Sequence, residues 1–161
     1  MFGLFKKKQT RQVTVDQLKV THLKSIDYEP KIILAWAKAV KGNTDLTNWL
    51  KDNGYLELYM ATQAIYLKDE ARNWLTQNGD AHLMAFINAA EGNESAQKWL
   101  SIHGMDLLYH MALAIEHDQD SWKWIQDNSS QDIFLLTKSI REVKDMIEEN
   151  HNDIHSFGKD A

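Results

Sequence analysis

The sequence contains no cysteine, one proline and only seven glycines. The absence of cysteine excludes disulfide bonds, thiolate zinc sites and cysteine nucleophiles. Proline and glycine are the residues that most often interrupt helices, so their scarcity over 161 residues favours a helical fold. The chain has the length of one ordinary domain and is long enough to bury a core. We therefore expect a single all-α domain.

Two further absences restrict the partners and the location. The formal net charge is −5, whereas a nucleic-acid binder needs a surplus of Lys and Arg to neutralise phosphates. No apolar run approaches the roughly 20 residues of a membrane-spanning helix. The apolar residues at the start precede the lysines, which is not the order of a secretory signal. We expect a cytoplasmic protein that does not bind nucleic acid.

The sequence repeats with a period of 25 residues. The clearest marker is a tryptophan followed by Leu or Ile, at Trp49-Leu50, Trp74-Leu75, Trp99-Leu100 and Trp124-Ile125. Five residues after each tryptophan come Gly54, Gly79, Gly104 and Ser129. Three further columns keep the period: Ile33, Leu58, Leu83, Leu108 and Ile133; Ala39, Ala64, Ala89, Ala114 and Ser139; and Val40, Ile65, Ala90, Ile115 and Ile140. So many columns in phase indicate a tandem array of similar units.

Each unit has the pattern of two short helices. In the first helix, apolar residues recur at i, i+3, i+4 and i+7, as at Ile33, Trp36, Ala37 and Val40. A turn follows at Gly42-Asn43, and the second helix ends at Asn53-Gly54, where glycine can take the left-handed conformation. Helices of about ten residues are marginal alone, so the units must stack. We predict tandem helix-turn-helix repeats stacked as an α-α superhelix, or solenoid, with capping helices.

Two of the columns have a predicted role in packing. Each tryptophan lies between apolar neighbours at i−3 and i+1, so its ring is expected to face the core. Burial of a ring of ~200 Å² is worth roughly 5 kcal/mol. The column that begins at Ala39 places a methyl group where the helix of the neighbouring unit must approach closely.

The repeats also define the domain organisation. A helical-repeat domain at 13–155 is expected between a flexible basic tail at 1–12 and a flexible C-terminal tail at 156–161. Thr14-Val-Asp-Gln17 has the form of a capping box. The predicted elements are a cap helix at 14–26, repeats at 30–54, 55–79, 80–104 and 105–129, and a divergent capping repeat at 130–154 without the tryptophan.

The segment Ala85–Asp106 resembles the helical part of an ankyrin repeat. It combines an Ala-rich helix, a Gly-Asn turn, a second helix and a terminal Gly-x-Asp. The period of 25 is shorter than the roughly 33 residues of ankyrin repeats, which leaves no room for their β-hairpin finger. The resemblance implies a shortened, ankyrin-like stack that binds protein.

A stripe of large apolar side chains on the first helices is the candidate binding surface. Its members occupy one slot in each unit, about 100° around the helix from the core column. We call this the aromatic stripe: Leu34, Tyr59, Met84, Tyr109 and Phe134, with Tyr66 and Leu113 beside it. It predicts a non-enzymatic adaptor or scaffold that binds a protein or peptide, or a homo-oligomer formed through the same surface. Packing between repeats is the alternative interpretation of the stripe.

Two other classes of function stay open. A metal-binding protein or enzyme would use the acid–base cluster His110, Glu116, His117 and Asp118, or the helical set Glu148, His151, Asp153 and His155. The sequence carries no glycine-rich phosphate loop, nucleophile elbow or cofactor motif. A weakly membrane-attached adaptor would use its basic, apolar start: Phe2, Leu4, Phe5, Lys6, Lys7, Lys8 and Arg11.

Overall fold

The computed structural model of the protein describes residues 26–157, and side chains as far as residue 152. In this range every regular element is a helix, so the all-α prediction is confirmed there. The helices are α2 (Pro30–Val40), α3 (Thr44–Asp52), α4 (Leu56–Ile65), α5 (Asp69–Gln77), α6 (Ala81–Ala90), α7 (Glu94–Ile102), α8 (Asp106–Ile115), α9 (Gln119–Asn128) and α10 (Gln131–Phe157). The predicted tail at 1–12 and all but the last residue of the predicted cap helix at 14–26 lie outside the described residues.

The helices form consecutive pairs, α2–α3, α4–α5, α6–α7 and α8–α9, whose members pack against each other. Three of the second helices begin at a side-chain cap. The side chains of Asn43, Asn93 and Asp118 accept a hydrogen bond from the backbone N–H three residues later, at 3.0, 2.9 and 2.8 Å. Such caps satisfy a donor that the helix itself leaves without a partner. The fourth second helix, α5, has Lys68 in this place and no side-chain cap.

The turn inside each pair depends on a residue in the left-handed conformation. The turn position recurs every 25 residues, with φ of 99° at Gly42, 65° at Leu67, 91° at Gly92 and 69° at His117. Only glycine takes such angles without strain. The fifth residue of this column is Glu142, and there the chain does not turn. Residues 130–154, predicted as a capping repeat, therefore belong almost wholly to the single helix α10, which continues to Phe157.

The Gly42→Ala variant is expected to lose about 1–2 kcal/mol of unfolding free energy, which is the cost of the left-handed conformation for a residue with a Cβ. Space is not the reason, since a Cβ at Gly42 would have no atom within 4 Å. Gly92→Ala is expected to cost more, because its Cβ would also lie 3.0 Å from Glu116 Oε2. Urea denaturation of both variants measures the difference. An unchanged stability in Gly42→Ala would contradict the assigned backbone angle.

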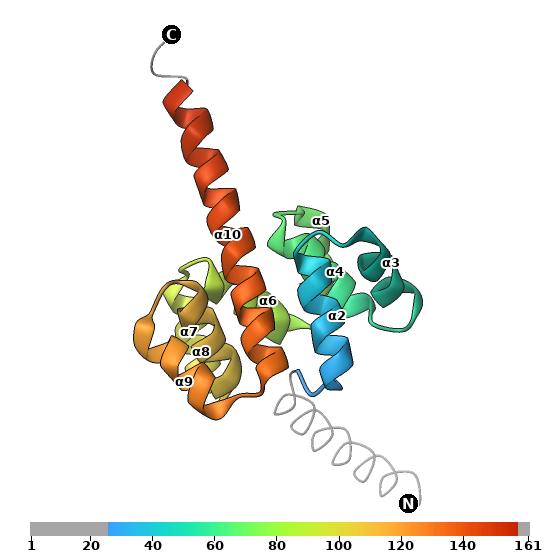
Figure 1. The fold of residues 1–161 in the computed structure, drawn as a ribbon, viewed down its shortest axis with the longest axis horizontal. Coiled ribbons are helices and arrows are strands. Elements are labelled where there is room, and N and C mark those ends of the chain that lie inside the picture. The colour runs from blue at the N-terminus through green and yellow to red at the C-terminus, as the bar shows by residue number, and fades with distance from the viewer. Residues whose placement is uncertain (1–25, 158–161) are drawn as a thin grey trace, which may run out of the picture.

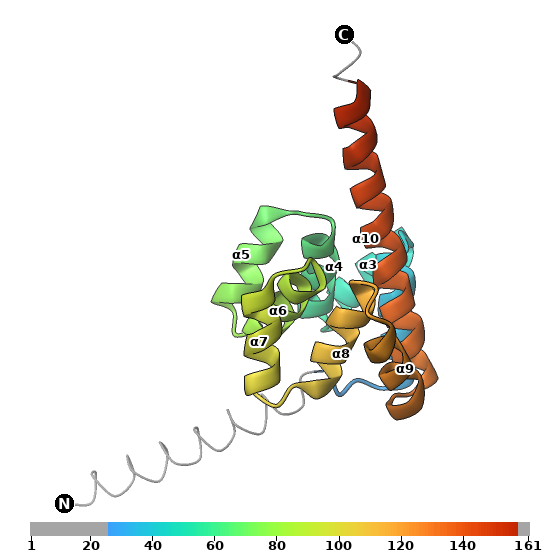
Figure 2. The same cartoon turned by 90° about the vertical axis from the view of Figure 1, so that its left-hand side faces the viewer.

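The first helices of the pairs surround the core. Each contacts the next in chain order, α2 with α4, α4 with α6, and α6 with α8. The last helix, α10, contacts α8 on one side and α2 on the other, and its contact with α2 is the most extensive between any two helices (Figure 1). The first and the last of the described helices, α2 and α10, are therefore in contact. The C-terminal part of α10 extends beyond the other helices, as Figure 2 shows from the side.

The tryptophan column lies at the edge of this core. The prediction of buried rings is wrong for Trp49, whose exposed fraction is 40%, and Trp74, Trp99 and Trp124 are only half-buried. The residue that follows each tryptophan is fully buried instead, at Leu50, Leu75, Leu100 and Ile125. The rings cover the border of the core and stack on neighbouring side chains, such as Tyr55 and His103.

The alanine column is buried as its small size suggests. Ala39, Ala64, Ala89 and Ala114 are at most 1% exposed. The fully buried indole belongs to Trp36, outside the repeating column, and its Nε1 donates a hydrogen bond to Thr62 Oγ1 at 3.1 Å. This bond joins α2 to α4 and gives the buried indole N–H its partner.

None of the described helices is long and apolar enough to span a bilayer.

Candidate functional site

An apolar pocket with a volume of about 160 Å³ opens where the C-terminal ends of α4 and α6 face the middle of α10. We call it the α10 pocket. Its apolar lining comes from Ile65, Leu67, Phe86, Ile87, Ala90, Ile140 and Ile147, and its polar lining from Glu91, Lys144, Glu148 and His151. Apolar cavities of about 150 Å³ bind molecules the size of benzene. The pocket therefore has room for one ring or one branched side chain.

The small side chain of Ala90 leaves this space open. In its column the other units carry Val40, Ile65, Ile115 and Ile140, all of them larger and all buried. The second cause is α10, which continues past the point where the other first helices turn. Its residues Ile147 and His151 form a wall beyond the ends of α4 and α6.

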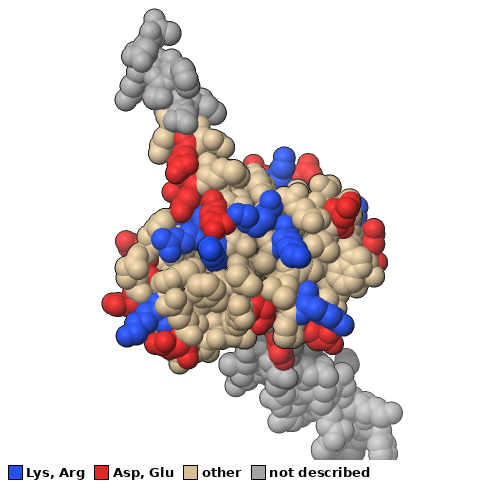
Figure 3. Space-filling view, viewed as in Figure 1, with Lys and Arg blue, Asp and Glu red and all other residues tan. Residues whose placement is uncertain are grey.

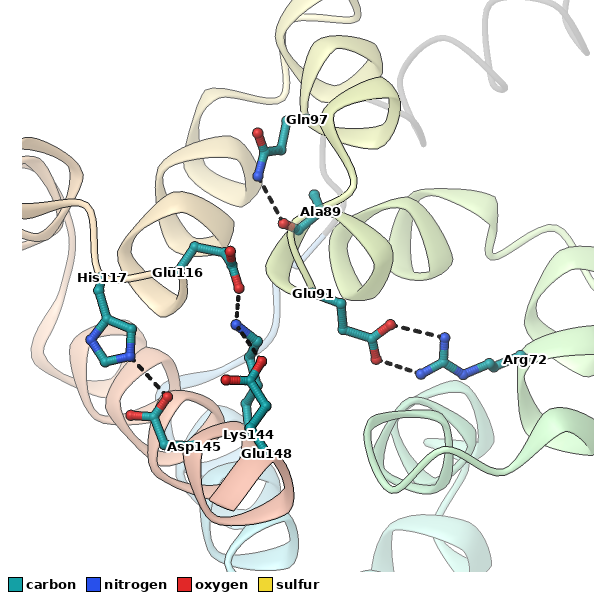
Figure 4. A network of polar contacts seen from close by, with 9 residues as sticks. All are labelled: Arg72, Ala89, Glu91, Gln97, Glu116, His117, Lys144, Asp145 and Glu148. Atoms are coloured by element: carbon teal, nitrogen blue, oxygen red, sulfur yellow. Dashed lines mark hydrogen bonds and ion pairs between the residues drawn. The ribbon is translucent and has the colours of Figure 1, made fainter. Parts of the chain in front are cut away.

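Lys144 places a fixed positive charge at the pocket. Its side chain is only 11% exposed, and its ammonium group pairs with Glu116 and, at 3.3 Å, with Glu148 (Figure 4). Glu116 follows the end of α8 and reaches Lys144 past Gly92, which has no Cβ to obstruct the carboxylate. The contact thereby connects α8 to the wall of the pocket.

A second ion pair holds Glu91 at the pocket. Nη1 and Nη2 of Arg72 donate to the two carboxylate oxygens of Glu91, and Nη2 also donates to the carbonyl of Ala64 at 2.9 Å. In the next unit, Gln97 Nε2 donates to the carbonyl of Ala89 at 3.0 Å (Figure 4). Side chains of the second helices thus add a second hydrogen bond to carbonyls at the ends of α4 and α6, which also accept the backbone N–H of Leu67 and of Gly92.

Two further turns contact α10 through charged side chains. Lys41, after α2, pairs with Glu142, and His117, after α8, has Nε2 at 2.8 Å from Asp145 Oδ1. Arg141 donates to His117 Nδ1 at 2.7 Å. Because a guanidinium can only donate, Nδ1 accepts and the proton lies on Nε2, facing Asp145. Figure 3 shows blue and red patches next to each other on this face of the molecule.

The residues of the predicted aromatic stripe differ in how far they are exposed to solvent. Leu34 is 37% exposed and Met84 is buried at 8%, while Tyr59, Tyr109 and Phe134 are half-buried. Each half-buried ring contacts a neighbour: Lys51 over Tyr59, His110 beside Tyr109 and Trp122 against Phe134.

The two residues beside the stripe are also half-buried. Tyr66 donates its hydroxyl to the carbonyl of Val40 at 2.6 Å, which joins α4 to α2. Leu113 lies on α8. None of the seven residues lines the α10 pocket, although Tyr66 stands between two that do, Ile65 and Leu67. Binding through the stripe stays a prediction.

In the predicted acid–base cluster, His110 and Asp118 both contact Ser121, whereas Glu116 and His117 pair with residues of α10. The ring of His110 stacks on Trp124 at 4.1 Å, and burial there lowers the pKa of its imidazole. Asp118 accepts the backbone N–H of Ser121, which lowers the pKa of that carboxyl. Glu116 pairs with Lys144, and His117 with Asp145, as described above.

The second predicted metal set is only partly described. His151 lines the α10 pocket and Glu148 pairs with Lys144, whereas the side chains of Asp153 and His155 lie outside the described residues. Within the described part of the chain, no three His, Asp or Glu side chains are grouped so that they could hold a metal ion.

Of the residues that line the α10 pocket, Glu148 and His151 were sequence candidates, as members of a metal set, and the others were not predicted as site residues. One signal was present, since Ala90 is the small member of a column that otherwise holds Val and Ile. The basic segment at the start of the chain lies outside the described residues. Comparison with protein families, curated proteins and solved structures finds no match to this chain, so the ankyrin resemblance stays a prediction.

Proposed function

We propose that the protein is a non-enzymatic helical-repeat adaptor that binds a protein or peptide segment in the α10 pocket. In this proposal the units stack as an α-α superhelix whose ends are brought together by α10. The repeating turn position and the contacts of each first helix with the next support the stacking. The contact of α10 with α2 supports the closure.

The observation that carries the binding proposal is the apolar lining of the pocket beside fixed charges. Protein interiors are close-packed, and the atoms lining an empty space lose dispersion contacts. An apolar side chain from a partner would restore those contacts. The ion pairs of Glu91 and Lys144 beside the apolar walls provide polar groups that orient a ligand, as is usual in binding pockets.

Affinity capture with the intact protein tests this proposal against the alternative surface. The bait proteins are the wild type, Ala90→Ile, which fills the pocket, and Ala81→Ile, which adds the same side chain at an exposed position of the same helix. A fourth bait, Tyr59→Ser with Tyr109→Ser, alters the aromatic stripe. We expect a partner that the wild type and Ala81→Ile retain, and that folded Ala90→Ile loses by at least tenfold in affinity.

Two other results of the capture experiment would contradict binding in the α10 pocket. A partner lost only by the stripe variant would move the binding surface to the first helices and contradict the pocket. A partner retained equally by all four baits would exclude both surfaces. Circular dichroism of each bait must first show native helix content, so that a lost partner is not the result of unfolding.

A further inference from the structure

The surroundings of the α10 pocket favour a ligand whose apolar part lies in the pocket and whose positive charge lies at the edge of the pocket. Glu91, Glu116 and Glu148 lie in or beside the pocket, against the two cations that pair with them, Arg72 and Lys144. The C-terminal ends of α4 and α6 also face it, and a helix C-terminus carries partial negative charge. The balance of charge around the pocket is therefore negative.

One segment of this chain has the matching chemistry. Residues 2–11 contain Phe2, Leu4 and Phe5, followed by Lys6, Lys7, Lys8 and Arg11, and no acidic residue. The ring of phenylalanine is the size of benzene, for which a cavity of about 150 Å³ has room. Phe5 directly precedes three lysines, so that a ring placed in the pocket would bring them to the carboxylates at its edge.

We propose that Phe5 of this segment occupies the α10 pocket of the same chain and that Lys6–Lys8 lie against Glu91 and Glu148. This proposal does not require the adaptor function, because the contact depends only on residues of this chain.

The chain is long enough for the contact to form within one molecule. Fourteen residues separate Arg11 from Ile26, and fully extended they would span about 46 Å. The ion pair of Lys41 with Glu142 places the C-terminal end of α2 at the level of the pocket. The segment must therefore pass the length of α2, about 16 Å at 1.5 Å per residue. A tether of this length gives an effective concentration in the millimolar range, so a weak contact suffices.

Methyl NMR of the full chain tests the contact. The chain has no cysteine, so Gln9→Cys provides a unique position for a nitroxide spin label. We expect the label to broaden the isoleucine methyl signals of the pocket, Ile87, Ile140 and Ile147, and to leave Ile33 and Ile133 sharp. The broadening should be unchanged by dilution and should weaken with added salt, since the lysines contribute through exposed charges.

Two variants of the labelled protein decide the assignment. Phe5→Ser should abolish the selective broadening without changing the fold, and Ala90→Ile should abolish it by filling the pocket. Ala81→Ile is the matched control and should retain it. Pocket methyl signals that stay sharp in the wild type would overturn the proposal, as would broadening that survives both variants.

Broadening that disappears on dilution would show that the segment enters the pocket of a second copy, which contradicts the contact within one chain. The result is independent of the capture experiment. Broadening that depends on Phe5 can occur without any captured partner, and a partner lost by Ala90→Ile can exist without broadening.

Discussion

The Leu100→Ala variant is expected to be less stable than the wild type by about 3–5 kcal/mol of unfolding free energy. Leu100 is a fully buried residue of α7. Removal of three of its carbons loses their transfer free energy and also leaves a cavity. The Trp99→Ala variant removes a larger side chain and is nevertheless expected to cost less, about 2 kcal/mol. Its ring is half-buried, and only the buried part of its ~200 Å² counts at ~25 cal/mol/Å².

Urea denaturation of both variants, followed by helix content, measures the two free energies on one scale. The pair Trp74→Ala and Leu75→Ala repeats the comparison in another unit, where the tryptophan is again half-buried and the leucine fully buried. A larger loss in the tryptophan variants than in the leucine variants would place the rings in the core and contradict the structure.

Ala89→Ile and Ala90→Ile are expected to change stability in opposite directions. The two alanines are adjacent on α6, and both are buried. Ala89 is fully buried and does not line the pocket, so added carbons should cost about 1–3 kcal/mol or more through overpacking. Ala90 lines the α10 pocket, so the same carbons should be accommodated and raise stability by up to about 2 kcal/mol, at ~0.8 kcal/mol per buried methylene.

Because the same substitution is made at neighbouring positions of one helix, differences in helix propensity largely cancel. The midpoint of urea denaturation gives the sign of each change, and methyl NMR of Ala90→Ile shows whether the new side chain contacts Ile140 and Ile147. A loss of stability in Ala90→Ile comparable to that in Ala89→Ile would mean that the pocket is not open in solution.

Local patterns in the sequence were sufficient for the helices of the first unit. The apolar spacing of Ile33, Trp36, Ala37 and Val40 predicted a helix that the structure has at Pro30–Val40. Gly42 marked the following turn, where φ is 99°, and Asn43 caps the next helix. These features act between residues close in the chain, through backbone hydrogen bonds and steric limits on φ. Residues close together in the sequence therefore determine the helix, the turn and the cap.

Periodicity could not determine which residue of each second helix lies deepest. Trp99 and Leu100 are about 100° apart around α7, and both belong to its apolar face. The packing of that face on the first helices decides that Leu100 is enclosed and that Trp99 remains at the border. The α10 pocket has the same origin, since Ala90 is small in the sequence but the space beside it depends on where Ile140 and Ile147 lie.

The sequence by itself determined the all-α class and the turns at Gly42 and Gly92, because these follow from interactions between residues a few positions apart. Only the tertiary structure decided that α10 contacts α2 and passes over the ends of α4 and α6. That arrangement depends on how side chains interdigitate across each helix–helix interface, and no local sequence pattern records it.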